Sequence, residues 1–162
     1  MSRRTTILLT GMALLGLAFG ALPQFASGQQ SDPLLGTWQL NVAKSKYSPG
    51  PAPKSNTVNV QAEGQNHKLT AKGINAEGNP TSGEVVWIYD GMPHPRSNPN
   101  YDAEAAKRID AYTIIFSRTK AGKLVETVTN VLSQDGKSAT ITTTGINVNG
   151  QPVNNITVFE KQ

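Results

Sequence analysis

The sequence predicts an all-β protein, an antiparallel up-and-down meander of eight or nine strands closed into a barrel. Apolar and polar side chains alternate along the chain more often than apolar residues recur at helical spacing. The alternating runs are rich in Val, Ile and Thr, and glycine-containing turns separate them. The 162 residues include 15 glycines and 10 prolines, a composition that suits a turn-rich β protein. A two-sheet β sandwich is the alternative that this spacing leaves open.

The N-terminal segment has the pattern of a secretory signal peptide. Arg3 and Arg4 precede an apolar stretch over residues 7–22, and small residues at Ala26 and Gly28 follow it. Three glycines and a proline weaken the stretch as a membrane-spanning helix. We therefore expect a signal peptide over residues 1–28 and a single β-barrel domain over residues 29–162. This pattern predicts a protein exported to the periplasm or the extracellular space, with no stable membrane span after the signal is removed.

The expected strands follow one another in short alternating runs. In order, they cover residues 37–42, 57–62, 68–71, 84–89, 107–109, 112–117, 124–132, 139–144 and 155–159. Glycine occurs where a hairpin needs a positive φ, in the turns around Gly64, Gly78, Gly122, Gly136 and Gly150. Hairpins of this length join neighbouring antiparallel strands. A flat meander would leave two open edges, so we favour closure into a barrel.

Two segments interrupt this rhythm. Residues 48–53 (SPGPAP) are too rich in proline for a central strand and predict an extended connector between the first two strands. Residues 92–101 contain three more prolines and predict an irregular loop, either a functional element or a crossover at one barrel end. The following residues 102–107 (DAEAAK) are compatible with one helical turn capped by Asp102.

Both ends of the mature chain carry a family resemblance. Residues 35–40 read LGTWQL, residues 45–47 read SKY, residues 134–137 read QDGK, and residues 158–161 read VFEK. These segments resemble lipocalins and cytoplasmic fatty-acid-binding proteins, the calycin barrels. The whole pattern is most similar to secreted lipocalin-like proteins of soil bacteria, a group that implies location and fold but no activity. The resemblance implies that Trp38 lies across the closed end of the barrel.

The chain also departs from the fatty-acid-binding proteins. The proline-rich connector cannot form the helix pair that they carry between the first two strands. Their Arg-x-Tyr pair, which grips a carboxylate from the last strand, falls on Thr157 and Phe159. A fatty-acid carrier function therefore does not follow from the resemblance.

Two strands present the residues that could bind a ligand. Trp87 and Tyr89 share one face of their strand with Val85, and Arg118 continues by period two the face of Tyr112, Ile114 and Phe116. If both faces point inward, the interior carries the candidate ligand-binding residues Trp87, Tyr89, Tyr112, Phe116 and Arg118. Arg118 could hold an anionic head group. Alternatively it reaches water or stacks on Trp38, and the aromatic side chains simply fill the interior.

Composition argues against several other functions. Cysteine is absent, and the spacing of His67 and His94 is not that of a metal site, so we expect no metal and no cofactor. No nucleophile stands beside a base, and the carboxylates of Asp102, Glu104 and Asp110 suggest a solvated surface, so we expect no enzyme. The net charge of +4 falls to +2 without the two signal arginines, and the lysines are dispersed, which argues against nucleic-acid binding. We expect a monomer.

Two functions remain. The first is an exported lipocalin-like barrel that binds a small hydrophobic or amphipathic ligand. The second is a solid barrel that serves as an envelope structural or protein-interaction domain without a ligand. An interior cavity of several hundred cubic ångströms would favour the first function, and a filled interior would favour the second.

Overall fold

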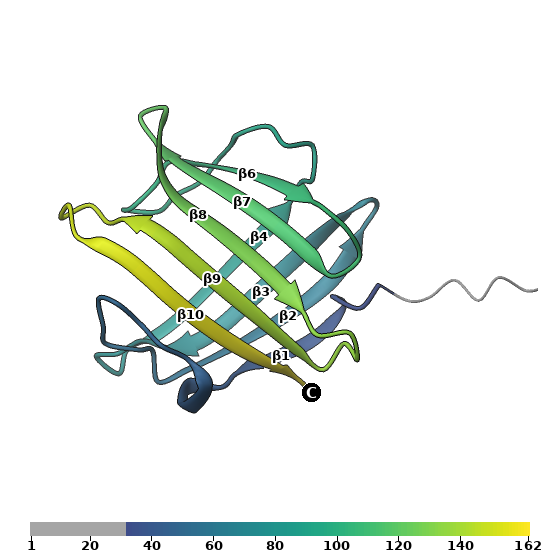
Figure 1. The fold of residues 1–162 in the computed structure, drawn as a ribbon. Helices are drawn as coiled ribbons and strands as arrows, with labels where there is room; N and C mark the ends of the chain where they lie inside the picture. Colours follow the sequence, from purple (N-terminus) through teal and green to yellow (C-terminus); the bar gives the residue numbers. More distant parts are fainter. Residues whose placement is uncertain (1–31) are drawn as a thin grey trace, which may run out of the picture. The chain divides into compact units, whose positions relative to one another are not determined.

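The computed structural model describes residues 32–162, which form one antiparallel sheet of ten strands (Figure 1). The strands are β1 (Gly36–Leu40), β2 (Ser55–Glu63), β3 (Asn66–Ile74), β4 (Pro80–Trp87), β5 (His94–Pro95), β6 (Ala103–Arg108), β7 (Thr113–Lys120), β8 (Lys123–Leu132), β9 (Ser138–Ile146) and β10 (Pro152–Lys161). The expected signal peptide lies outside the described residues. Within residues 32–162, no helix has the length and apolar character needed to cross a bilayer.

The sheet has the order β4-β3-β2-β1-β10-β9-β8-β7-β6-β5, so β1 pairs with β10 and the remaining neighbours are successive in the chain. Figure 1 shows β2, β3 and β4 behind β7 to β10, because the sheet curls until its two halves face each other. A single curled sheet confirms the calycin-like barrel prediction and excludes the two-sheet sandwich. The prediction of eight or nine strands was one or two short.

Side chains and loop contacts join the two ends of the sheet where strand pairing stops. Trp87 of β4 packs on Phe116 of β7 with 4.7 Å between ring centroids. Beyond β4, the amide of Gly91 donates a hydrogen bond of 3.1 Å to the carbonyl of Ala106 in β6. The Arg96 guanidinium donates to the carbonyl of Val86 at 3.0 Å. The segment between β4 and β6 therefore closes the barrel laterally.

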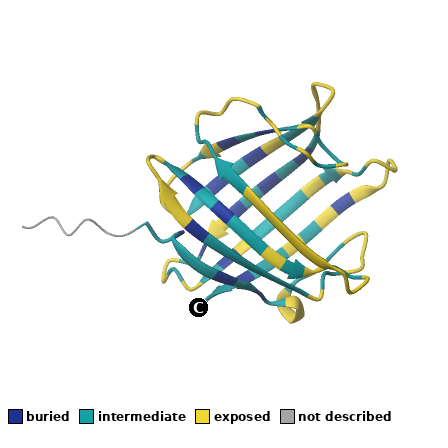
Figure 2. Ribbon diagram, turned by 180° about the vertical axis from the view of Figure 1, so that it is seen from behind, coloured by how far each residue is buried: buried dark blue, intermediate teal, exposed yellow. Residues whose placement is uncertain are grey.

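One face of the curled sheet forms the interior. Figure 2 shows buried positions alternating with exposed or intermediate ones along the strands, as a pleated sheet with one inward face requires. The buried core includes Trp38 and Leu40 of β1, Ile114 and Phe116 of β7, and Phe159 of β10. Trp87, Tyr89 and Tyr112 are partly buried and pack against this core. The inward face assigned to these aromatic residues from the sequence is confirmed.

The structure confirms one of the predicted irregular segments and changes the description of the region that follows β4. The proline-rich connector between β1 and β2 is confirmed, and only a single turn of 3-10 helix, η1 (Val42–Lys44), precedes it. The loop over residues 92–101 contains the two-residue strand β5. The prediction of a helical turn over residues 102–107 is wrong, because residues 103–108 form β6 and pair with β7.

Candidate ligand-binding cavity

The interior of the barrel holds a cavity of about 910 Å³. Its wall is mostly apolar and comes from both halves of the curled sheet. Val58 and Val60 of β2, Leu69 and Ala71 of β3, and Val85 and Trp87 of β4 line one side, and Ala139 and Ile141 of β9 with Phe159 of β10 line another. The cavity reaches the exposed residues Pro95 of β5 and Ser97 of the loop after it. The sequence alternative in which large side chains fill the interior is therefore wrong.

Trp38 closes one end of the cavity, as the family resemblance implied. Trp38 is 3% exposed, and its indole Nε1 donates a hydrogen bond of 2.8 Å to the carbonyl of Leu34 in the turn before β1. The ammonium of Lys161 lies 5.2 Å from the centre of the indole ring and donates to the carbonyl of Pro33. The indole N–H of Trp38 and the ammonium of Lys161 thus hold the carbonyls of Leu34 and Pro33 in the turn before β1.

A partly buried polar cluster stabilises the same closed end. Arg108 forms a two-pronged ion pair with Asp32, and the Asp32 carboxylate also contacts Nε2 of His67 at 3.1 Å. The other ring nitrogen of His67 is 2.6 Å from the Tyr89 hydroxyl. Both ring nitrogens of His67 therefore have a partner, and the residue is 3% exposed. His67 links the turn before β1 to the end of β4.

Burial and charge act against each other in this cluster. Burial lowers the pKa of His67 below its ordinary value of 6.5, and the nearby Asp32 carboxylate only partly offsets this. For Asp32, burial favours the neutral acid, but the hydrogen bonds and charge of Arg108 outweigh it and hold the pKa below 3.8. Burial also raises the pKa of the Tyr89 hydroxyl. The cluster thus contains a charged Asp32–Arg108 pair next to a neutral His67 and a neutral Tyr89 at neutral pH.

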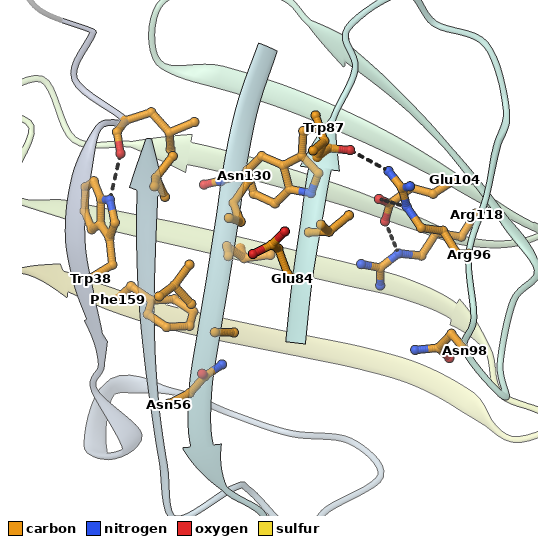
Figure 3. A pocket seen from close by; sticks show the side chains of 18 of the residues that line it. Trp38, Asn56, Glu84, Trp87, Arg96, Asn98, Glu104, Arg118, Asn130 and Phe159 are labelled. Atoms are coloured by element: carbon orange, nitrogen blue, oxygen red, sulfur yellow. Dashed lines mark hydrogen bonds and ion pairs between the residues drawn. The ribbon is translucent and has the colours of Figure 1, made fainter. Parts of the chain in front are cut away.

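A second polar cluster lies in the cavity wall near the loop side (Figure 3). Nε of Arg118 donates to Glu104 at 2.8 Å. Nη1 of Arg118 donates at 3.0 Å to Glu126, which lies beside the cavity lining. Nε of Arg96 reaches the second oxygen of Glu104 at 3.3 Å. The guanidinium of Arg118 lies 4.5 Å from the ring centre of Tyr101. Two cations and two anions therefore compensate one another, although Glu104 and Glu126 are almost fully buried.

These carboxylates keep Arg118 charged. Burial alone would disfavour its guanidinium, but the charges and hydrogen bonds of its partners raise the pKa above the ordinary value. Stacking on Trp38, one alternative for Arg118, is wrong, because Arg118 lies over Tyr101 and the cation over Trp38 is Lys161. The expectation that Glu104 is solvated is also wrong, since β6 turns its side chain inward to 3% exposure.

Asn130 of β8 is the third polar feature of the wall. The residue is 2% exposed and lines the cavity between its strand partners Ile114 of β7 and Ile141 of β9. Its side-chain oxygen Oδ1 is buried and has no hydrogen-bond partner among the described residues. A buried polar atom is normally paired, so this acceptor distinguishes Asn130 from the two ion-pair clusters.

The structure separates the five residues predicted to bind a ligand. Trp87 and Arg118 line the cavity. Phe116 lies behind Trp87 as its packing partner, Tyr89 belongs to the closed-end cluster, and Tyr112 packs against the core, so these three support the wall and do not form it. The strand faces were therefore assigned correctly, but burial on the inner face does not by itself give contact with the cavity.

The sequence analysis missed Glu104, Glu126, Asn130, Arg96 and Tyr101. For two of them a signal was present, because Glu126 and Asn130 alternate with Thr127 and Thr129 and share the face of Val128 and Leu132 in a strand that was recognised. Polar residues on an otherwise apolar inner face indicate buried interactions. Arg96 and Tyr101 lie in the irregular loop, where periodicity carries no information about direction.

Comparison with known proteins gives the fold and no closer relationship. No protein-family model matches the chain, and no curated protein matches it in sequence. Among solved structures, the wild-type fluorescent protein UnaG is similar with a TM-score of 0.53 at 14% identity, covering 80% of this chain and 97% of that one. The zebrafish ileal bile acid-binding protein complexed with cholic acid has a TM-score of 0.53 at 12% identity, covering 80% and 99%. The described chain has a calycin-like barrel fold.

Proposed function

We propose that this protein is a binding barrel for one small hydrophobic or amphipathic molecule. The cavity of about 910 Å³ carries the proposal. Ligand pockets in proteins commonly measure about 300–1,000 Å³ and combine an apolar wall with a few polar groups. Most of the lining side chains are Val, Leu, Ile, Ala and aromatic residues. The polar side chains of the wall are Asn56, Glu84, Ser97, Asn98, Asn130 and the ion-pair cluster around Arg118.

The fold neighbours support the same function. The zebrafish protein was solved with cholic acid, so a barrel of this fold accommodates a small organic molecule. The alternative function, a solid barrel that acts as a structural or interaction domain, needs a filled interior. The cavity of about 910 Å³ argues against that alternative.

The proposed role is binding without catalysis. Both ring nitrogens of His67 are held by Asp32 and Tyr89, so this imidazole offers no free base to the cavity. Glu104 and Glu126 are each paired with a guanidinium. These pairings leave the wall suited to holding a molecule, which supports a binding protein in preference to an enzyme.

We place this binding function outside the cytoplasm, because the signal-peptide pattern of residues 1–28 is the only targeting feature that the sequence shows. Intact-mass measurement of the protein recovered from the periplasm or medium tests this placement. Export with cleavage predicts a chain that begins at Gln29. Full-length protein retained in the cytoplasm would contradict it.

A dye titration tests the binding function. Nile red, an uncharged dye whose emission depends on its surroundings, should bind the wild-type protein at a stoichiometry near one and quench tryptophan emission from Trp87. Ala71→Trp introduces a large side chain into the cavity wall and should weaken dye binding by about tenfold or more.

Lys72→Trp is the matched control, because Lys72 is adjacent in β3 and exposed on the outer face. Its affinity for the dye should equal that of the wild type. Equal affinity in all three proteins would place the dye on the surface and contradict the proposed cavity function.

A further inference from the structure

We propose that the ligand is uncharged and carries a hydrogen-bond donor that binds the side-chain oxygen of Asn130. This inference rests on the proposed binding function and specifies the chemistry of the molecule. Two independent observations carry it: the unpaired acceptor of Asn130 and the pairing of every ionised side chain that lines the cavity with an opposite charge.

The first observation concerns the acceptor. Asn130 is 2% exposed, lines the cavity, and has flanking strand partners that are both isoleucines. A leucine at this position would avoid the cost of burying an amide, so an unpaired Oδ1 lowers the stability of the protein by itself. A hydroxyl or N–H group of a molecule in the cavity would supply the missing partner. A molecule that only accepts hydrogen bonds would leave Oδ1 unpaired.

The second observation concerns charge. At the loop side of the wall, Arg96, Arg118 and Glu104 form a chain of ion pairs with Glu126 beside them, and this chain has no net charge. Glu84 also lines the cavity, and its carboxylate is paired with Lys68 at 3.0 Å. A carboxylate entering the cavity would have to break one of these pairs or remain uncompensated in an apolar space, and either is unfavourable. An ammonium group faces the same penalty. The wall therefore favours an uncharged molecule, although the sequence alone had suggested an anionic head group at Arg118.

The spacing of residues along β8 also indicates how long the bound molecule is. Glu126 marks the ion-pair cluster and Asn130 follows four residues later on the same face, so the two side chains are about 13 Å apart along the strand. Between them the same face presents Val128. A molecule with its donor at Asn130 and an apolar body of that length would extend toward the loop side of the cavity.

Three compounds with the same chain length separate these requirements: decan-1-ol has a donor, decyl methyl ether has only an acceptor, and decanoate is an anion. Each competes with Nile red for the wild-type protein. The alcohol should displace the dye at a concentration about three to ten times lower than the ether, the range expected for one net hydrogen bond. Decanoate should bind no better than the ether.

Asn130→Leu keeps the size of the side chain and removes the acceptor, so the preference for the alcohol over the ether should vanish. Asn56→Leu is the control, because Asn56 also lines the cavity but its residue is only partly buried. This variant should keep the preference. Dye binding by both variants shows that they fold, so a failure to fold would be recognised.

Each outcome has a distinct meaning. If Nile red and all three compounds fail to bind the wild type, the binding function itself is wrong. If the dye binds but alcohol and ether compete equally, or if Asn130→Leu retains the preference, the assignment of a donor to Asn130 is overturned. If decanoate competes best, the inference of an uncharged ligand is overturned while the binding function stands.

Discussion

At the scale of single residues, Asn130 and His67 represent two ways of burying a polar side chain. His67 has a partner on each ring nitrogen, whereas the oxygen of Asn130 has none among the described residues. A buried group that is paired contributes to stability, and one that is unpaired subtracts from it. His67 holds the closed end of this barrel together, and Asn130 lies in the cavity wall with its oxygen unpaired.

The stability of Asn130→Leu tests this distinction without any ligand. Removing an unpaired buried acceptor should leave the free energy of unfolding unchanged or raise it by about 1 kcal/mol, because leucine has no polar atom to bury. Urea denaturation of the ligand-free protein measures the change. A loss of about 2 kcal/mol or more would mean that the amide has a stabilising partner and would contradict its assignment as a free acceptor.

The pH dependence of stability tests the role of His67. Because its pKa is lowered in the folded protein, the unfolded chain binds more protons than the folded one once the pH falls below about 6.5. Stability should therefore rise with pH up to about 6.5 and then level off as far as this residue is concerned. His67→Gln should flatten the profile between pH 5 and 6.5, measured by thermal unfolding across that range.

The control for this measurement is His94→Gln, since His94 of β5 contacts Asp90 and its side chain is more exposed than that of His67. This variant should retain the wild-type slope. A slope that disappears with His94 and persists without His67 would show that the closed-end cluster does not titrate as described. The pKa of Asp32 is also lowered in the folded protein. Below about pH 4 we therefore expect a further loss of stability, because the Asp32 carboxylate becomes protonated and its ion pair with Arg108 is lost.

At the scale of elements, strand pairing decides the conformation where local preference does not. Residues 103–107 (AEAAK) favour helices and Asp102 is a preferred helix N-cap, and this composition led to the expectation of a helical turn. In the structure Glu104 and Ala106 face inward, and six residues pair with β7. Pairing with a strand already fixed in the sheet outweighs an intrinsic preference of a few tenths of a kcal/mol per residue.

The elements that could be predicted from the sequence are those with both alternation and a glycine turn. The hairpin between β7 and β8 is an example, because Gly122 has a φ of 75° and the inward face of Ile114 and Phe116 follows from period two. The site was harder to predict. The partners of Arg118 come from β6 and β8, and the sequence does not show which residues of distant strands will lie opposite each other.

Gly145 of β9 provides a test at the same scale. A Cβ at this position would lie 2.0 Å from the carbonyl oxygen of Val125 and 2.7 Å from Cα of Glu126 in β8. Gly145→Ala must separate the two strands beside Glu126 and should reduce the free energy of unfolding by about 1–3 kcal/mol. Gly83→Ala, in β4 with no neighbouring atom within 4 Å, should change it by less than about 0.5 kcal/mol.

Urea denaturation of both glycine variants measures this difference. Equal effects would mean that β8 and β9 do not approach each other as closely as the structure has them. A destabilised Gly145→Ala protein should also bind Nile red less tightly, since Glu126 of the ion-pair cluster lies directly beside the site of separation.

At the scale of the whole molecule, a curled sheet of ten strands encloses more space than its inner side chains fill. The barrel could be predicted from alternation, turns and the Gly-x-Trp start of β1. The cavity could not, because its volume depends on where the small inward residues Ala71 and Ala139 lie relative to Trp38 and Trp87 across the interior. That arrangement is fixed by the curl of the sheet.

Native mass spectrometry tests the central claim, that the cavity holds one small molecule, most directly. The wild-type protein, purified without detergent and mixed with Nile red, should carry one bound molecule that is lost on denaturation. Lys72→Trp should behave in the same way, and Ala71→Trp should remain largely unbound. The wild type appearing only at the mass of the bare chain, or Ala71→Trp binding as much dye as the wild type, would contradict the claim.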